Sequence, residues 1–236
     1  MKLLRCLLIL ISSLFNAQSF NIKIESFDYK ESKLIINYSI QNLLNRAQYL
    51  VVNPKGFETY FDIDEYSYNL ENFNEKRKNL FSPRIVLYDE HNNIVKVDLF
   101  SLSSPVDSIE KKMINEYNSQ LKKKKEYYLP FKRKFKKPFG WIEIHETINN
   151  NILNFEAFEK KTFIGAVDLD KFIYDPIFKS NETFNMKENE TYSFSLKLKQ
   201  DANFLKEFID NKKVNIKDLN IISEKQSFIY RKVIHN

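Results

Sequence analysis

Short runs of alternating apolar and polar residues are the feature that most constrains how this chain can fold. Such alternation puts apolar side chains on one face of a β-strand, whereas a helix repeats about every 3.6 residues. The clearest run covers residues 33–40, where one face carries Leu34, Ile36, Tyr38 and Ile40. Residues 192–198 alternate in the same way. The pattern predicts antiparallel strands, each with one buried face.

Polar clusters between the alternating runs predict where the chain turns. One hairpin is expected around Lys30-Glu31-Ser32, and a second around the connection at 90–93. The aromatic content of 15% suits strand faces that pack against one another. We therefore expect a mainly β fold, an antiparallel β-sandwich that is Ig-like in the loose sense. Further strands are expected at 84–88, 94–100, 141–145, 154–158, 162–167 and 228–234.

Two segments have a helical period instead. Ser104 and Pro105 are typical of an N-cap and a first helical position. The apolar residues that follow recur at helical spacing and are Ile109, Met113, Tyr117 and Leu121. We expect this central amphipathic helix to end before Pro130. A shorter helix is expected over residues 201–211, with one apolar face.

The central helix and the lysine-rich stretch after it divide the chain. We expect a signal peptide over 1–19, a β region over 20–103, a helix with a basic aromatic segment over 104–138, and a β region over 139–236. The two β regions form either separate small domains or one sandwich with a helical insertion. A chain of 236 residues can bury a sizeable core in either arrangement.

The first 19 residues have the composition of a secretory signal peptide. Lys2 and Arg5 give a basic start, residues 6–15 are apolar, and small residues near Ala17 suit cleavage. A bilayer-spanning helix needs about 20 apolar residues, so we expect no permanent membrane anchor. Cleavage would remove Cys6, the only cysteine. The mature chain would then have no thiol nucleophile and no cysteine-ligated metal, and it would be periplasmic or extracellular.

The leader and the strand rhythm together resemble uncharacterised exported β-sandwich proteins of flavobacteria and their relatives. The resemblance rests on the Asn16-Ala17-Gln18 end of the leader and on the alternating runs described above. It implies export and a sandwich fold. It implies no substrate, cofactor or partner.

Few residues suggest catalysis. The chain has three glycines, and phosphate-binding loops, dinucleotide fingerprints and nucleophile elbows all need glycine. We expect no cofactor and no metal site, and we expect the pairs Asp62-x-Asp64 and Asp168-x-Asp170 to be solvated surface. His145 is the catalytic candidate, because on a strand it would share a face with the carboxylate of Glu143. The alternative is that this face of the strand is ordinary polar surface.

The densest pattern lies between Leu121 and Trp141, where nine basic residues and one acid, Glu126, alternate with aromatic side chains. Basic residues concentrate polyanions, and aromatic residues stack or anchor at interfaces. In the alternative interpretation the first lysines solvate a helix end, and Lys132, Lys134 and Lys136 protect an edge strand. The candidate binding residues are Lys122, Lys123, Lys124, Lys125, Tyr127, Tyr128, Lys132, Arg133, Lys134, Lys136, Lys137 and Trp141.

The sequence thus favours an exported, non-catalytic binding or structural protein of the cell envelope. Export makes an envelope polyanion, an acidic glycan or an acidic protein the expected partner, and makes nucleic acid unexpected. Two alternatives stay open. One is an exported hydrolase that uses His145 and nearby carboxylates, and the other is a periplasmic inhibitor or immunity-type protein. The sequence does not indicate the oligomeric state.

Overall fold

The computed structural model describes residues 18–54, 56–59, 81–95, 97–101, 108–169, 173–175 and 180–231. Nearly all of the expected signal peptide lies outside these residues, as do the expected N-cap at 104–105 and the acidic residues Asp62, Asp64 and Asp170. The side chains of the expected apolar stripe from Ile109 to Leu121 are also outside the described set. The described part is mainly β, as predicted, with antiparallel sheets and three helices.

One layer of the fold is a sheet of three strands, β1 (Phe20–Lys30), β2 (Lys33–Asn42) and β8 (Lys160–Asp168), in the order β1-β2-β8. The predicted first hairpin is confirmed, since Lys30 pairs with Lys33 across a two-residue turn. Glu31 and Ser32 have φ of 52° and 61°. Positive φ at both turn residues gives the twist that joins antiparallel strands tightly.

The second layer is built around β11 (Thr191–Gln200), which pairs antiparallel with three strands. These are β5 (Arg84–Tyr88), β12 (Leu219–Ile222) and β13 (Gln226–Ile229). The short strand β4 (Glu58–Thr59) adds a parallel pair on the far edge of β5. The strands predicted at 84–88 and 192–198 are confirmed, and the last strand begins and ends earlier than predicted.

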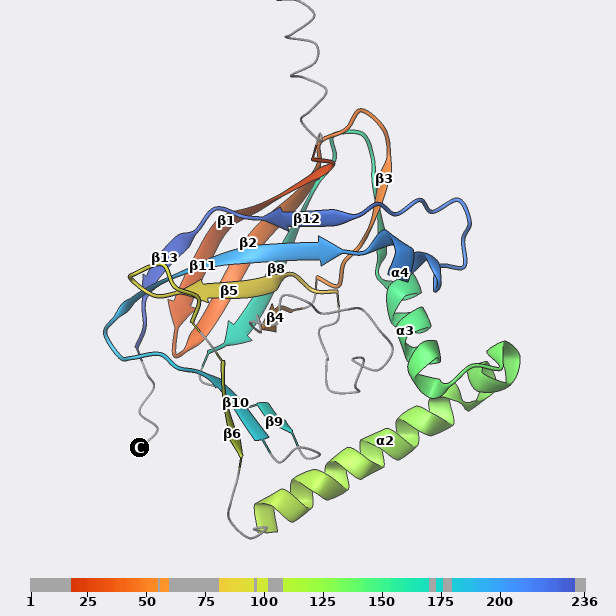
Figure 1. The fold of residues 1–236 in the computed structure, drawn as a ribbon, viewed down its shortest axis with the longest axis horizontal. Helices are drawn as coiled ribbons and strands as arrows, with labels where there is room; N and C mark the ends of the chain where they lie inside the picture. The colour runs from red at the N-terminus through yellow and green to blue at the C-terminus, as the bar shows by residue number, and fades with distance from the viewer. Residues whose placement is uncertain are drawn as a thin grey trace, which may run out of the picture.

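The two layers face each other and enclose the main core (Figure 1). The predicted apolar faces point inward, so that Ile36 and Phe194, from opposite layers, are fully buried. The rings of Phe27 and Phe194 meet edge to face across the interface, with centroids 5.2 Å apart. Burial of each such side chain contributes roughly 1.5–3 kcal/mol. The fold is therefore sandwich-like, although it is not a clear immunoglobulin arrangement.

Two small sheets extend the sandwich. β3 (Gln48–Val51) pairs with β7 (Ile152–Phe155), and β10 (Ser180–Phe184) pairs with both β6 (Val97–Ser101) and β9 (Ile173–Asp175). The predicted second hairpin is correct only at its turn, where Tyr88 bridges Ile94. β6 cannot continue that ladder, because β5 already has β11 and β4 on its two edges.

Helix α2 (Ser108–Phe135) is roughly 42 Å long at 1.5 Å per residue. The prediction that it ends before Pro130 is wrong, since Pro130 lies inside it. Proline removes one backbone N–H from the helix ladder. Pro130 is exposed, so water can hydrate the carbonyl that loses its partner. The alternative of an edge strand with Lys132, Lys134 and Lys136 is also wrong, because the first two lie in α2 and the third follows it.

Helix α3 (Phe139–Asn150) replaces the strand predicted at 141–145, which is wrong. Trp141, Ile144 and Ile148 are spaced three and four residues apart, and they pack into one apolar cluster. The alternation from Trp141 to His145 is too short to separate a strand period from a helical one. The sequence pattern was therefore ambiguous here, and burial on one helical face decided the outcome.

Helix α4 (Ala202–Lys206) begins where predicted but is shorter. The carboxylate of Asp201 caps it, accepting hydrogen bonds from the backbone N–H groups of Asn203 and Phe204 at 2.8 and 3.1 Å. The N–H of Leu205 bonds to the carbonyl of Asp201, four residues back, whereas those of Glu207 and Phe208 bond three residues back, which tightens the chain and ends the helix. α3 and α4 share a second apolar cluster beside the sandwich, which includes Ile144, Ile148, Leu205, Phe208 and Ile216.

Candidate functional site

The C-terminal half of α2, the turn at 136–138 and the start of α3 form a helical hairpin, here named the basic arm (residues 122–141). Lys136 ends α2 in the left-handed conformation, with φ of 54°, and its N–H donates to the carbonyl of Lys132 at 2.9 Å. Pro138 then starts α3. α3 runs beside the sandwich near α4, while α2 extends away from the two sheet layers (Figure 1). The arm is thus positioned outside the β core.

Polar contacts between α2 and α3 hold the hairpin together. Lys124 pairs with Glu143, and the hydroxyl of Tyr127 donates to the carboxylate of Glu146 at 2.7 Å. Tyr128 is buried, and its ring lies 5.0 Å from that of Tyr127. Burial, with the nearby Glu146 carboxylate, raises the pKa of Tyr128. Among the predicted binding residues, Lys124 and Tyr128 therefore stabilise the hairpin, while Tyr127 does so and is also 56% exposed.

Trp141 anchors the root of the arm. Its ring stacks on that of His145, with centroids 4.9 Å apart and an interplanar angle of 22°, and lies 5.4 Å from Phe208. The ammonium of Lys137 lies over the Trp141 ring, 5.4 Å from its centroid. Trp141, a predicted binding residue, is half-buried and connects the arm to the second apolar cluster.

The remaining cations of the arm face solvent. Within the described part of the chain, Lys124 is the only one of the nine basic residues that pairs with a carboxylate. Lys132 lies 4.7 Å from the Phe139 ring centroid and Lys134 lies 4.9 Å from that of Phe135. These cation–π contacts orient the side chains without neutralising their charge. The exposed cations are Lys122, Lys123, Lys125, Lys132, Arg133, Lys134, Lys136 and Lys137.

An open hollow beside some of these cations is lined by residues of α2 and by the first residue of α3. Lys122, Lys125 and Glu126 contribute charged groups to its lining, and Leu129 and Phe139 contribute apolar surface; Asn118 completes the lining. Leu129 is 41% exposed. The hollow therefore combines cations with apolar surface, which suits a ligand that has an anionic and an apolar part.

His145 is buried at the junction of α3 and α4, where it does not meet the predicted carboxylate. Its Nε2 lies 2.9 Å from Oδ1 of Asp210, whereas Glu143 pairs with Lys124. The imidazole lies against the rings of Trp141 and Phe135, and its side chain is 10% exposed. The predicted pairing with Glu143 is therefore wrong. The geometry fits a contact that docks α3 better than an accessible general base.

Asn149 completes this contact and was not identified from the sequence. Its amide donates to the backbone carbonyls of His145 and Phe208 at 2.8 and 2.7 Å, and its carbonyl accepts from the N–H of Asp210. His145 and Asn149 are four residues apart, which places them on one helical face. Helical spacing would have identified the pair if α3 had been recognised as a helix.

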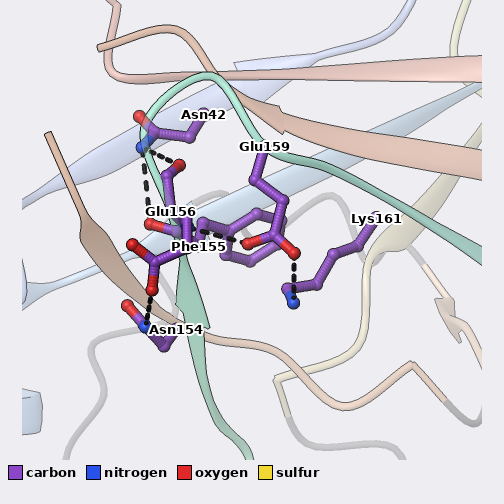
Figure 2. Close-up of polar contacts among 6 residues, drawn as sticks. All are labelled: Asn42, Asn154, Phe155, Glu156, Glu159 and Lys161. Carbon is purple, nitrogen blue, oxygen red and sulfur yellow. Dashed lines mark hydrogen bonds and ion pairs between the residues drawn. The ribbon is translucent and has the colours of Figure 1, made fainter. Parts of the chain in front are cut away.

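A second polar cluster fixes the turn between β7 and β8. The buried amide of Asn42 donates to the carbonyls of Arg46 and Glu156, both at 2.8 Å, and its oxygen accepts from the N–H of Leu44. Figure 2 shows the carboxylate of Glu159 between Lys161 and the backbone of Glu156. These contacts lower the pKa of Glu159, with the Lys161 hydrogen bond as the main cause. These groups use their hydrogen-bonding capacity on one another, so the cluster stabilises the turn.

Comparisons with protein-family models, with the curated proteins and with solved structures find no match. Within the described residues, no helix is both long enough and apolar enough to cross a bilayer. No group of three or more histidine, cysteine, aspartate or glutamate side chains in this part of the chain is arranged to hold a metal ion.

Proposed function

We propose that this protein is an exported, non-catalytic binding protein of the cell envelope that attaches to an anionic surface through its basic arm. The observation that carries the proposal is the tip of the hairpin, where Lys132, Arg133, Lys134, Lys136 and Lys137 are all exposed. Five like charges within six positions repel one another, and none of them pairs with a carboxylate of the described residues. An anionic partner would relieve that repulsion.

The surroundings of these cations favour an anionic lipid surface. Tyr127 is 56% exposed and Leu129 is 41% exposed, and both lie next to the basic residues. A combination of lysine, tyrosine and leucine on a helix suits the boundary between lipid headgroups and acyl chains. The predicted leader supports the same proposal, because export would bring the arm to envelope lipids or lipopolysaccharide.

Charge reversal at the tip tests the proposal. A variant with Lys132→Glu, Arg133→Glu and Lys134→Glu should lose at least about a hundredfold in affinity for vesicles that contain anionic lipid, since each cation near such a surface contributes about 1 kcal/mol. Binding of the unaltered protein should also weaken as salt is added. Vesicle co-sedimentation measures both effects.

A matched variant separates the arm from net charge. Lys212→Glu, Lys213→Glu and Lys217→Glu change the charge equally at exposed positions after α4, and this variant should bind vesicles nearly as well as the unaltered protein. Equal loss in both variants would contradict the proposal, as would binding to zwitterionic vesicles alone. Binding to a soluble acidic polysaccharide or an acidic protein, without binding to vesicles, would replace lipid with that partner.

A further inference from the structure

Strand β8 has one paired edge and one open edge. It lies at the end of the order β1-β2-β8, and it pairs with β2 along all nine residues from Lys160 to Asp168 with no register shift. Among the described strands, none pairs with its other edge. In an antiparallel ladder, alternate residues direct their N–H and C=O groups away from the partner strand. The open edge of β8 therefore presents a row of backbone groups that can bind another strand.

The opposite edge of the same sheet is protected, and β8 is not. β1 contains a register shift between Ile24 and Ser26, and the side chains of Lys23, Asp28 and Lys30 are charged and exposed. Bulges and charges are the usual means of blocking an edge. β8 has neither between residues 162 and 167, where the sequence is Thr-Phe-Ile-Gly-Ala-Val.

The outer face of β8 also exposes apolar surface. Ile164 is 69% exposed, and Ile35, which is opposite Ala166 on β2, is 42% exposed. The inner face is closed, because the ring of Phe57 covers Gly165 so tightly that a Cβ there would lie 2.5 Å from Phe57 Cε2. An added strand would therefore gain backbone hydrogen bonds along the edge and apolar contacts on the outer face.

The sequence of β8 is complementary to itself. Ile164 is the midpoint of the strand, so an antiparallel pairing centred on it is the register that aligns all nine residues. In this register Lys160 lies opposite Asp168, Thr162 lies opposite Ala166, and Ile164 meets itself. A lysine and an aspartate thus lie opposite each other at both ends, where Lys160 also contacts Glu25 of its own copy at 2.6 Å, and the most exposed isoleucine is covered at the centre.

We propose that two copies of this chain associate through β8, antiparallel and centred on Ile164. The three strands of each copy would join into one continuous sheet with the order β1-β2-β8-β8-β2-β1. Such an interface is isologous, because the same residues contribute from both copies. The inference goes beyond the proposed function and does not depend on it, since β8 and the basic arm are different surfaces.

Cysteine cross-linking tests the register directly. The variants are made with Cys6→Ser, so that the introduced thiol is the only one in the chain. Ile164→Cys should form a disulfide-linked dimer under mild oxidation, because directly opposed residues have Cα atoms about 4.5–5.5 Å apart, within disulfide range. Thr162→Cys should cross-link to Ala166→Cys in a mixed sample and only weakly to itself. Equal cross-linking of every variant with itself would overturn the register.

Sedimentation equilibrium tests the association itself. The unaltered chain should be dimeric, and Ile164→Lys should be monomeric with an unchanged circular dichroism spectrum, because this exposed position carries no core contact to lose. Ile222→Lys is the matched control, since Ile222 is 52% exposed on β12, an end strand of the other layer, and it should remain dimeric. A monomeric unaltered chain, or a dimer that persists in Ile164→Lys, would overturn the proposal. A β8 edge that binds only a foreign extended peptide would do the same.

Discussion

Side chains of the basic arm divide into those that build the hairpin and those that remain available. Lys124 and Tyr128 make their contacts within the hairpin, and Tyr127 donates its hydroxyl to Glu146 while leaving much of its ring exposed. Lys132 and Lys134 use aromatic rings as supports and keep their charges in water. Substitutions in this segment are therefore expected to have different effects, depending on whether the residue makes contacts within the hairpin. We expect truncation of Lys124 or Tyr128 to destabilise the hairpin, and truncation of an exposed lysine to weaken the proposed binding.

Glu25 makes the stability of the outer face of the sandwich depend on pH. Its carboxylate accepts from Lys160 Nζ at 2.6 Å and from Ser39 Oγ at 2.7 Å, and these bonds lower its pKa from 4.5 to about 2. A depressed pKa in the folded chain adds stability above pH 4.5, and this contribution is lost as the pH falls toward 2.

Replacing the main partner of Glu25 tests this pH dependence. Lys160→Met should return the pKa of Glu25 toward 4.5 and reduce the loss of stability in acid. The carboxyl resonance of Glu25, followed by NMR during an acid titration, gives the pKa in both proteins. The same low value in the variant would show that Lys160 is not the cause.

Contacts between individual side chains were the hardest feature to predict from the sequence. The partner of His145 is Asp210, which is 65 positions away, and no local pattern indicates that pairing. The charges of the arm, in contrast, can be recognised as a group from the sequence, because they lie in two short stretches, 122–125 and 132–137. Which of them make contacts within the hairpin depends on the position of α3, and the sequence pattern predicts a strand there.

At the scale of elements, α3 is the connection between the arm and the sandwich. One side of α3 contacts α2 through Glu143 and Glu146, and the other packs on α4 through Ile144 and Ile148. The contact between His145 and Asp210, with Asn149, closes this junction. The orientation of the arm relative to the sandwich therefore depends on how firmly α3 is docked.

Removal of the His145 ring should loosen α3 without unfolding the sandwich. His145→Ala loses the stacking on Trp141 and the hydrogen bond to Asp210, and we expect it to lower the free energy of unfolding by about 2 kcal/mol. Asp210→Ala should cost less, because the Asp210 side chain is 67% exposed and leaves the imidazole stacked. Urea denaturation measures both values. A larger loss for Asp210→Ala would show that the stacking is not the main contribution.

Strand positions could be predicted where apolar and polar residues alternate over a long run. The pairing of strands that are far apart in the sequence could not. The runs at 33–40 and 192–198 specify both a strand and its buried face, so local residues were sufficient. Nothing local indicates that β6 pairs with β10, about 80 residues later, because that choice follows from the occupied edges of β5. The helix through Pro130 was missed because solvent exposure of that position is a tertiary property.

The whole molecule combines a sandwich, a projecting basic arm and an open sheet edge. Strands before and after the helical hairpin share both layers, with β2 paired to β8 and β5 paired to β11. The helical hairpin is therefore an insertion in one sandwich, whose layers contain strands from both sides of it. If two copies pair through β8, each dimer carries two arms, and simultaneous attachment of both would raise the apparent affinity for a surface above that of one arm.

Hydrogen exchange measured with and without vesicles tests the central claim most directly, because it locates the surface that binds. With vesicles that contain anionic lipid, we predict that backbone amides of residues 122–141 exchange more slowly, while amides of the sandwich strands exchange at the same rate as in the free protein. High salt should abolish the difference. Protection confined to the sandwich strands, with the arm unchanged while the protein is bound, would contradict the account.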